Sequence, residues 1–373
     1  MVEISVIIPV YRGSRLLPEL LGTLLNQKMD PGLYEIIVII DEPTEYSLNL
    51  LKKYEKKVRF VVNKKRLGKA NVLNHAVKRS SGNILLFLDS DITLPDDRDY
   101  LKKIIDEMED ADILDIKKEV IRNSFLSRIT YYEYVGFNIG SWFVSKFAGK
   151  CPAVNGSAFA VKKKVLTSLK GFRKVIAEDL DLAVRAFLEN YRFKYTKQIN
   201  VYNSVHSNWK NWLTQRKRWS IGAALWFKEW YKDLLKICAK QPQIFLPGLF
   251  FLFPSIVLVL LYFFMPNLLM YKFFSLIFLL LAVKLNFMFP VLWLSTISID
   301  FIKSLLSSVL SFLSFLIVFF VLSKKLDFRF KLHEFLVYYF FYSLLGLFVM
   351  IAALISVFFF DRKAARVISD WKI

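Results

Sequence analysis

The sequence predicts an α/β domain with a doubly wound sheet, followed by helices that associate with a membrane. Short apolar runs alternate with helical patterns up to about residue 205, and long runs without any charged residue follow residue 243. The chain of 373 residues is 55% hydrophobic, yet it carries a net charge of +20. Such a chain must be divided into a water-exposed part and a lipid-exposed part, because neither environment alone suits both properties.

The N-terminal domain, residues 1–205, is predicted from four buried strands and the three helices between them. The strands are apolar on both faces, which suits a parallel sheet. They span 4–10, 35–41, 58–62 and 83–89, and the helices span 15–26, 45–56 and 69–79. Alternation at this spacing gives right-handed βαβ units. Ligands of such sheets bind beyond the carboxyl ends of the strands, so Asp41 and Asp89 are expected to share one crevice.

Residues 206–243 predict amphipathic helices at a membrane surface. The segment holds five of the eight Trp residues, at spacings that one helix face would group: Trp209, Trp212, Trp219, Trp226 and Trp230. Trp flanked by Lys and Arg is typical of a membrane–water boundary. Arg216 and Lys217 would then face lipid. The alternative is a soluble amphipathic helix that packs on the sheet.

Residues 244–360 predict about four membrane crossings. The runs 244–270, 304–323 and 335–360 contain no charged residue, and 273–299 is apolar except for Lys284. Each run is long enough to cross a hydrocarbon core of about 30 Å. The basic excess before residue 243 and in the tail 361–373 favours a cell-membrane protein with both ends in the cytoplasm. A re-entrant second segment would leave three crossings, and buried helices of a soluble domain are the remaining alternative.

Acidic residues gather where the chain is expected to leave the sheet. Asp41 ends the second strand, Asp89 and Asp91 end the fourth, and Glu178 and Asp179 open a later helical pattern. Two carboxylates one residue apart repel each other unless they are solvated, hydrogen-bonded or neutralised by a cation. Each position alone is weak evidence, and an Asp at a helix start can simply cap the helix.

The order of these motifs resembles that of the family 2 glycosyltransferases. The motifs are "SVIIPVYRG", "IIVIIDEP", "LGKANVLNHAV", "LLFLDSD", "AEDLDLA" and "QRKRW", over roughly residues 3 to 220. They look most like the membrane-embedded branch, which includes synthases of cellulose, hyaluronan and chitin, and ceramide glucosyltransferase. The resemblance implies a Rossmann-like nucleotide-sugar-binding domain of the GT-A type. "IIDEP" departs from the family pattern, because Glu42 and Pro43 replace the usual second Asp and Gly.

The resemblance also implies a reaction and its donor site. A sugar would pass, with inversion, from a nucleoside diphosphate sugar, expected to be a UDP-sugar. Asp91 and Asp89 would hold Mg²⁺ or Mn²⁺ against the diphosphate, since oxygen ligands favour these ions. The remaining donor contacts would come from Pro9, Tyr11, Asp41, Lys69 and Arg218. For Lys69, a solvated surface lysine is the alternative.

The acceptor side is implied in the same way. Asp179 would be the general base, with Glu178 orienting it or bonding the acceptor. Asn155, Gly156 and Gln215 would line the acceptor site and Trp219 would form its floor, although Trp219 could also be an interfacial residue. Arg218 would grip the diphosphate.

Several alternatives stay open from the sequence. The acceptor could be a membrane lipid or a growing polysaccharide, and an oligomer or partner subunit could complete a conduit. A different class of function is a non-catalytic membrane subunit that uses the fold for binding, although the intact acidic motifs oppose it. Nucleic acid is not expected as a partner, because no zinc-finger spacing or RNP-like motif accompanies the positive charge.

Overall fold

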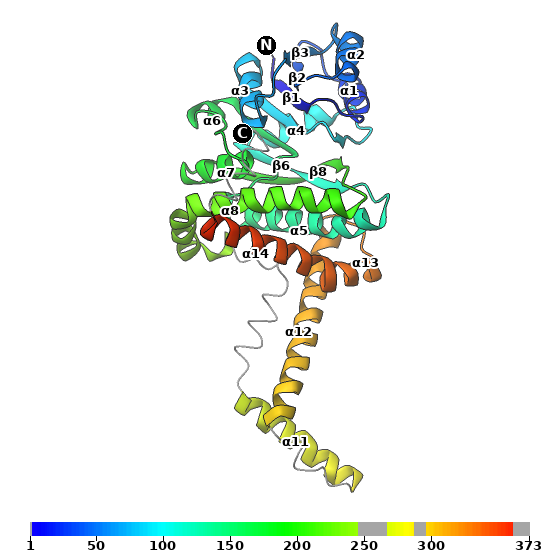
Figure 1. Ribbon diagram of the computed structural model, residues 1–373, viewed down its shortest axis with the longest axis vertical. Helices are drawn as coiled ribbons and strands as arrows, with labels where there is room; N and C mark the ends of the chain where they lie inside the picture. The colour runs from blue at the N-terminus through cyan, green and yellow to red at the C-terminus, as the bar shows by residue number, and fades with distance from the viewer. Residues whose placement is uncertain (1, 245–266, 287–295, 361–373) are drawn as a thin grey trace. The chain divides into compact units, whose positions relative to one another are not determined.

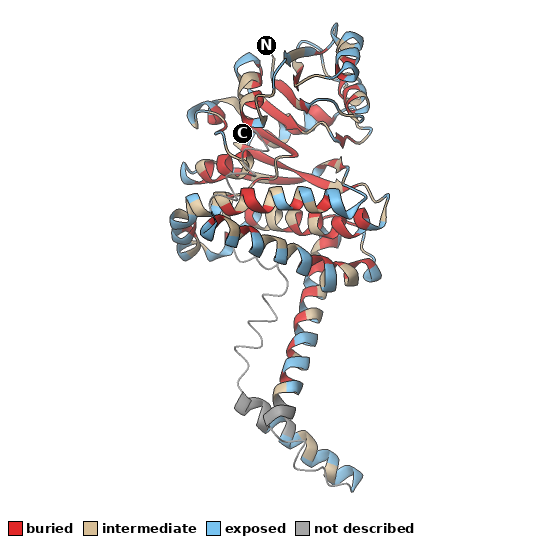
Figure 2. Ribbon diagram, viewed as in Figure 1, coloured by how far each residue is buried: buried red, intermediate tan, exposed pale blue. Residues whose placement is uncertain are grey.

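An eight-stranded mixed sheet forms the buried centre of the N-terminal region (Figures 1 and 2). The structure is a computed structural model that describes residues 2–244, 267–286 and 296–360. The strand order is β3-β2-β1-β4-β7-β6-β8-β5. The strands are β1 (Ile4–Tyr11), β2 (Tyr34–Asp41), β3 (Arg59–Asn63), β4 (Ile84–Leu88), β5 (Ile92–Thr93), β6 (Ile113–Val120), β7 (Ala158–Lys162) and β8 (Phe193–Asn203).

The first half of the sheet confirms the predicted parallel arrangement. β1 pairs in parallel with β2 and β4, and β2 pairs in parallel with β3. The connecting helices are α1 (Leu17–Leu25), α2 (Glu45–Tyr54) and α3 (Lys69–Arg79). Alternate residues of β1 from Ile4 to Val10 pack with the buried leucines of α1 in one apolar core. Burial on both faces therefore keeps β1 in the middle of the sheet.

The second half of the sheet is mixed, so the prediction of a doubly wound parallel sheet holds only for the first half. β7 runs antiparallel to both β4 and β6. Ala158, which opens β7, is therefore paired with Leu88, which ends β4. This reversal brings residues 155–157 to the carboxyl end of β4, where the acidic residues lie.

Five further helices lie between and after the later strands of this part of the chain, and the two longest lie together in a layer beside the sheet (Figure 1). The helices are α4 (Tyr100–Met108), α5 (Phe125–Ala148), α6 (Lys163–Ser168), α7 (Glu178–Leu188) and α8 (Trp209–Lys240). α5 packs on β6 and β8. The C-terminal elements α13 (Leu332–Val337), the π-helical turn η2 (Tyr338–Tyr342) and α14 (Ser343–Phe359) join this layer, with α13 and η2 on α5 and α14 beside α8 (Figure 1).

The chain accordingly divides into two compact units. One combines Met1–Gly248 with Lys331–Ile373, and the other is Leu249–Phe330. The second unit contains α11 (Asn267–Leu285) and α12 (Thr296–Lys325).

Two segments in the described part of the chain are long and apolar enough to cross a membrane. They are Asp300–Lys325 and Leu332–Phe359, which include the third and fourth predicted crossings. The first predicted crossing, 244–270, lies almost wholly outside the described residues, and so does the end of the second, 287–299, apart from the start of α12. The number of crossings remains a prediction.

The Trp residues of α8 do not all face outward, as an interfacial helix would require. Trp212 is only 1% exposed, and its indole N–H donates to the hydroxyl of Tyr342, 2.9 Å away. The indole of Trp226 donates to the carbonyl of Leu180, 3.1 Å away. The expectation of a lipid-facing Trp stripe is therefore wrong for Trp212, which is buried against Tyr342, whereas Trp226 is half-buried and bonded to α7.

Candidate active site

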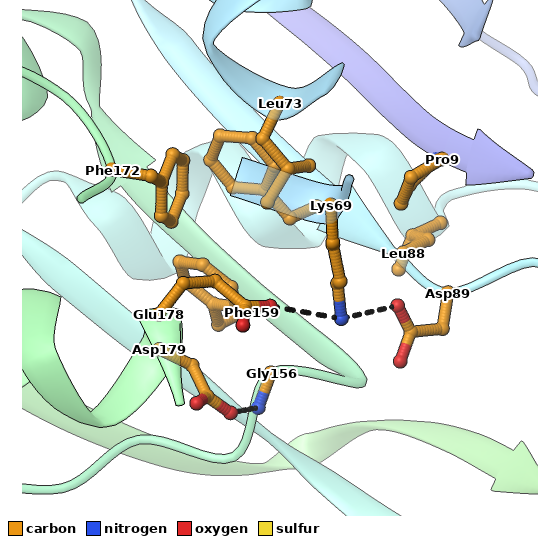
Figure 3. Close-up of a pocket in the computed structure, with 11 residues that line it drawn as sticks. Pro9, Lys69, Leu73, Leu88, Asp89, Gly156, Phe159, Phe172, Glu178 and Asp179 are labelled. Carbon is orange, nitrogen blue, oxygen red and sulfur yellow. Dashed lines mark hydrogen bonds and ion pairs between the residues drawn. The ribbon is translucent and has the colours of Figure 1, made fainter. Parts of the chain in front are cut away.

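A pocket at the carboxyl ends of β1 and β4 gathers six of the predicted site residues (Figure 3). They are Pro9, Lys69, Asp89, Gly156, Glu178 and Asp179, and they come from β1, α3, the end of β4, the segment before β7, and α7. Apolar side chains, including Phe159 and Phe172, close the pocket on one side. The parallel β1 and β4 end at the same edge of the sheet, which is why residues so far apart in sequence meet here.

Lys69 lies between two of the three acidic residues that line this pocket. Its ammonium is 2.9 Å from an Asp89 carboxylate oxygen and 3.3 Å from one of Glu178. Its side chain is 39% exposed, because the pocket opens to solvent. Desolvation lowers the pKa of Lys69, but the charges of Asp89, Glu178 and Asp179 outweigh this effect, so the net shift is upward. Lys69 is thus a fixed cation that neutralises a cluster of carboxylates.

Asp41 holds the loop that carries Lys69. The carboxylate of Asp41 is buried and accepts hydrogen bonds from the backbone N–H groups of Leu67 and Gly68, at 2.9 to 3.1 Å. Gly68 has φ of 85°, a conformation that favours glycine, and it precedes the first residue of α3. The structure therefore gives Asp41 backbone partners next to Lys69, and a contact between Asp41 and a nucleoside stays a prediction.

Asp179 is positioned by a close approach of Gly156. One carboxylate oxygen accepts from the N–H of Gly156 at 2.7 Å, and the other accepts from Leu180 at 2.9 Å. A Cβ atom at position 156 would lie 2.6 Å from Asp179 Oδ2, so only glycine fits without displacement. Asn155 shapes the same turn by accepting from Ser157 N–H at 3.1 Å.

Both acids at the start of α7 bind protons more tightly than usual. Burial raises the pKa of Glu178 to about 7; Lys69 opposes the shift and Asp179 adds to it. Burial also raises the pKa of Asp179, again opposed by Lys69. A carboxylate with a raised pKa is a better proton acceptor near neutral pH than an ordinary one.

Asp91 joins the site through its charge. Part of its side chain reaches solvent, but surrounding protein atoms and the charge of Asp89 raise its pKa to about 6. The charges of Lys69 and Arg218 lower it in return, so Arg218 of α8 lies within electrostatic reach of Asp91. The raised pKa of Asp91 indicates that a further cation beside it would be favourable.

The donor set fits a divalent cation shared with a phosphate-bearing ligand. Within the described ranges, no group of three or more His, Cys, Asp or Glu side chains is arranged to hold a metal ion by itself. Mg²⁺ is typically held by one or two carboxylates together with substrate phosphates. Asp91 and Asp89 supply such a pair.

The carboxyl ends of β1 and β2 carry an exposed aromatic ring among charged groups. Tyr11 is 46% exposed, and the guanidinium of Arg66 lies 4.5 Å from its ring centre. Arg12 and Glu42 form an ion pair of 3.1 Å, and both have positive φ, 61° and 58°. The carboxylate of Glu42, a residue that departs from the family pattern, is thus paired with Arg12. Backbone strain of this kind often accompanies ligand sites.

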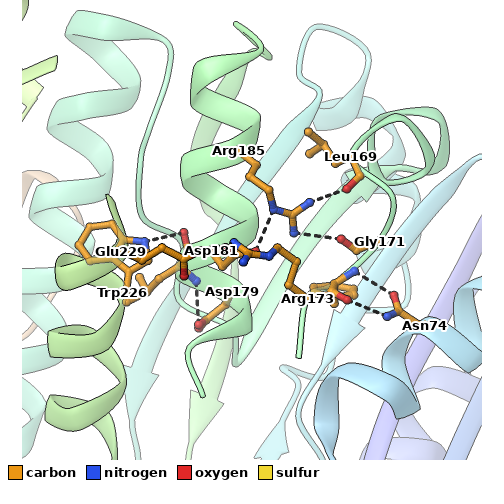
Figure 4. Close-up of polar contacts among 11 residues, drawn as sticks. Asn74, Leu169, Gly171, Arg173, Asp179, Asp181, Arg185, Trp226 and Glu229 are labelled. Carbon is orange, nitrogen blue, oxygen red and sulfur yellow. Dashed lines mark hydrogen bonds and ion pairs between the residues drawn. The ribbon is translucent and has the colours of Figure 1, made fainter. Parts of the chain in front are cut away.

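A polar network around the buried Asp181, which the sequence did not reveal, ties α7 to α8 (Figure 4). Asp181 accepts from Arg173 and Arg185, each at 2.8 Å. Arg173 also pairs with Glu229 of α8 at 2.7 Å. The indole of Trp226, on α8, reaches the backbone of α7 beside Asp179. The helix with the candidate base is therefore braced against the helix that carries Gln215, Arg218 and Trp219.

Arg216 is the centre of a second buried network, and its predicted lipid-facing position is wrong. It is only 5% exposed and pairs with Glu133 of α5. Tyr342 donates to Glu133 at 2.8 Å and accepts from Arg216 at 3.1 Å. The guanidinium also lies 4.4 Å from the ring centre of Trp219 and donates to Gln215 at 3.3 Å. Arg216 follows Trp212 by four residues and precedes Trp219 by three, which places all three on one helix face. This spacing was the sequence signal that Arg216 belongs with the two Trp residues.

Sequence comparison places the chain among glycosyl transferases. Residues 5–144 match the family described as "Glycosyl transferase family 2", and residues 84–360 match "Glycosyl transferase family group 2".

Individual relatives match parts of the chain. A probable glycosyltransferase, YdaM, of Bacillus subtilis is 25% identical over 235 residues, which is 59% of this chain and 55% of that protein. A poly(ribitol-phosphate) beta-glucosyltransferase of Bacillus spizizenii is 41% identical over 93 residues, 24% of this chain and 15% of that protein. The chain thus spans about half the length of the first of these relatives and much less of the second.

A solved structure shares the fold. The mannosyltransferase PcManGT from Pyrobaculum calidifontis, in complex with GDP-Man and Mn²⁺, matches with a TM-score of 0.51 and 20% identity, over 62% of this chain and 64% of that one. The N-terminal unit therefore has a fold of the GT-A type.

Proposed function

Since the chain belongs to glycosyl transferase family group 2, we propose that it transfers a sugar from a nucleoside diphosphate sugar to a membrane-associated acceptor, with inversion at the anomeric carbon. The observation that carries this proposal is the pocket in which Lys69 links Asp89 to Glu178, with Asp179 held beside them by Gly156. Together with Asp91, the pocket offers a fixed cation in Lys69, two carboxylates that could hold a metal ion against a phosphate, and a half-buried base in Asp179. These are the groups that such a displacement needs.

The proposed chemistry is a single displacement. Asp179 accepts the proton of the acceptor hydroxyl while that oxygen attacks the anomeric carbon, and the bond from this carbon to the diphosphate oxygen breaks. Lys69 and Arg218 stabilise the charge of the departing diphosphate. Asp91 and Asp89 would hold Mg²⁺ or Mn²⁺, which neutralises the same charge when bound. The Mn²⁺ in the complex of the Pyrobaculum enzyme supports this choice of ion.

The nucleoside is assigned to the surface around Tyr11. An exposed ring flanked by Arg12 and Arg66 offers stacking to a base and positive charge to phosphates. We expect a UDP-sugar, and the GDP-Man complex of the Pyrobaculum enzyme makes GDP-sugars the first alternative to test. Pro9 lines the pocket and precedes Tyr11 by two residues in β1, so this surface adjoins the pocket.

The acceptor is assigned to the side of Asp179 that faces α8. Trp219, supported by Arg216, would stack on a sugar ring, and Gln215 would bond its hydroxyls. The apolar segments after residue 243 support a membrane-bound enzyme of the cellulose, hyaluronan or ceramide glucosyltransferase type. The acceptor is then a lipid or a growing polysaccharide.

One experiment separates these outcomes. The full chain in lipid nanodiscs is given a panel of UDP- and GDP-sugars with Mn²⁺ or Mg²⁺, and release of nucleoside diphosphate is measured with and without EDTA. EDTA-sensitive release with labelled sugar in the organic phase indicates a lipid acceptor, and label in a large water-soluble product indicates polymer synthesis. The Asp179→Asn variant should bind the donor but release at least 10²-fold less nucleotide. No release from any donor would refute the proposal and favour the non-catalytic binding subunit.

A further inference from the structure

One amide side chain joins α3 to the turn that precedes α7. The amide nitrogen of Asn74 donates to the carbonyl oxygen of Phe172 at 2.8 Å, and the amide oxygen accepts from the N–H of the same residue at 2.9 Å. Figure 4 shows Asn74 reaching from α3 towards this turn, which spans residues 169–173. Because an amide carries a donor and an acceptor side by side, it can hold both backbone groups of one residue. We call this pair of hydrogen bonds the Asn74 clamp.

The backbone of the turn leaves room for the clamp. Lys170 and Gly171 both have positive φ, 60° and 77°. A Cβ atom at position 171 would lie 2.4 Å from the amide oxygen of Asn74, so only glycine lets the amide reach Phe172 without displacement. The conformation of the turn and the position of the amide therefore depend on each other.

The same turn is held from α7. Arg185 donates to the carbonyl oxygens of Leu169 and Gly171. Its Nε also donates to one carboxylate oxygen of Asp181 at 2.8 Å, and Arg173, which ends the turn, donates to the other oxygen at 2.8 Å. Because Arg185 and Asp181 belong to α7, the turn connects α3 to α7.

This connection matters because α3 and α7 carry the two sides of the charge cluster in the pocket. Lys69 opens α3, and Glu178 and Asp179 open α7. The ammonium of Lys69 stands at the end of a long side chain that is 39% exposed, 3.3 Å from Glu178. An ion pair with such an exposed partner holds its elements together only weakly. The clamp, which uses no charge, is the firmer connection between the two helices.

The residue that the clamp holds also forms part of the pocket wall (Figure 3). Phe172 lines the pocket and is 4% exposed, and its ring meets that of Phe87 edge-on, with centres 5.2 Å apart. Leu73, which precedes Asn74 in α3, lines the pocket too. A shift of the turn would therefore move a wall of the pocket and the acids of α7 together.

We propose that Asn74 is a positioning residue, which acts through the turn 169–173 to fix Lys69 relative to the two acids that open α7. Asn74 itself contacts neither donor nor acceptor. Since Lys69 matters here as the cation that meets the departing diphosphate, the effect of Asn74 on the reaction rests on the proposed function. The placement of α3 against α7 does not.

A double-mutant cycle on kcat/KM tests whether Asn74 acts through Lys69. Asn74→Ala should lower kcat/KM about 10-fold when Lys69 is present, but at most about twofold in a Lys69→Gln background, where no ammonium remains to be placed. Gly171→Ala, whose Cβ would displace the amide, is a second variant that should show the same dependence on Lys69. Equal losses in both backgrounds would mean that Asn74 only stabilises the fold, and this result would overturn the positioning role.

Asn138 of α5 provides a matched control. Its amide makes the same pair of hydrogen bonds to one backbone residue, because it accepts from the N–H of Lys118 at 3.0 Å and donates to its carbonyl at 2.9 Å. Asn138 is buried and lies outside the residues that line the pocket, so Asn138→Ala should lower Tm at least as much as Asn74→Ala. Its effect on kcat/KM should be the same factor with and without Lys69. A dependence on Lys69 here too would mean that lost stability alone explains the cycle.

A distance measurement separates the positioning role from the proposed activity. Spin labels at Lys78→Cys in α3 and Leu188→Cys in α7, both exposed positions, report the separation of the two helices by pulsed electron paramagnetic resonance. The full chain, with Cys151→Ser and Cys238→Ser, is studied in lipid nanodiscs. The distance distribution should be wider in Asn74→Ala than in the parent chain or in the α5 control. An unchanged distribution would overturn the positioning role even in an active enzyme. A wider distribution in a chain that releases nucleotide from no donor would support the positioning role and refute the proposed function alone.

Discussion

Gly156 is the residue on which the geometry of Asp179 depends most directly. In Gly156→Ala the new Cβ would lie 2.6 Å from Asp179 Oδ2, so the carboxylate must move. A displacement of about 1 Å at a reacting group can cost 10²-fold, and we expect kcat/KM to fall by about that factor while donor affinity is retained. Steady-state kinetics and donor titration measure the two quantities. Gly140→Ala in α5 is the matched control, because its Cβ meets nothing within 4 Å. Full activity in Gly156→Ala would exclude Asp179 as the base in this position.

Lys69 sets the pH range in which Asp179 can accept a proton. Its positive charge lowers the pKa of Asp179, against the upward effect of burial. Removing the charge in Lys69→Gln removes the largest effect that opposes burial and leaves only the hydrogen bonds from Gly156 and Leu180 against it, so the pKa of Asp179 rises and Asp179 stays protonated to higher pH. The ascending limb of the kcat/KM profile should therefore move to higher pH. Lys69→Arg keeps the charge and should leave the limb near its original position. A limb that does not move in Lys69→Gln would contradict the assignment of Asp179.

At this scale, the sequence predicted which residue types gather but not all of their partners. Asp89 and Asp91 could be placed because the end of a parallel strand is a position that topology fixes. Arg216 could not, because Glu133 and Tyr342 are 83 and 126 residues away in sequence. The sequence pattern of a basic residue between two Trp residues is the same whether that helix face contacts lipid or protein.

At the scale of the elements, the position of α8 depends on the hydroxyl group of Tyr342 in η2. Tyr342 accepts from Trp212 and Arg216 and donates to Glu133. Tyr342→Phe therefore leaves the buried Trp212 and Arg216 and the half-buried Glu133 each short of a partner. We expect a loss of about 1–3 kcal/mol in unfolding free energy. Because Arg216 supports Trp219, the acceptor KM should rise several-fold while the donor KM stays the same. Tyr191→Phe, which loses one exposed hydrogen bond, is the control. A rise in both KM values, or in neither, would show that the network does not position Trp219.

The elements of the first half of the sheet were predictable and those of the second half were not. Strands and helices up to Leu88 follow the predicted ranges within a few residues, because each apolar run is bounded by charges or Gly. The reversal at β7 has no local signal, since a buried antiparallel strand has the same composition as a buried parallel one. For the same reason hydropathy identified α14 as apolar but could not distinguish a crossing from a helix packed on α8.

Contacts between the C-terminal segment and the region of α5, about 200 residues earlier in the chain, hold the first compact unit together. Glu334 is buried and pairs with Arg122. The hydroxyl of Tyr132 both donates to the carbonyl of Lys331 and accepts from its N–H, at 3.0 and 2.9 Å. These contacts, with the Tyr342 network, make the C-terminal segment part of the unit that holds the pocket.

In a chain that ends after residue 330, the N-terminal part should therefore no longer fold stably. The truncation removes Glu334, the ion-pair partner of the half-buried Arg122, and removal of α14 exposes the apolar side of α8. We expect a large drop in Tm, rapid cleavage by trypsin and no donor binding. In the matched variant, a flexible Gly/Ser linker of about 40 residues replaces 249–330 and the C-terminal segment is retained. It should keep a cooperative thermal transition and bind the donor, because every contact just described lies within the retained unit. A truncated chain as stable as this linker variant would show that the two parts fold independently.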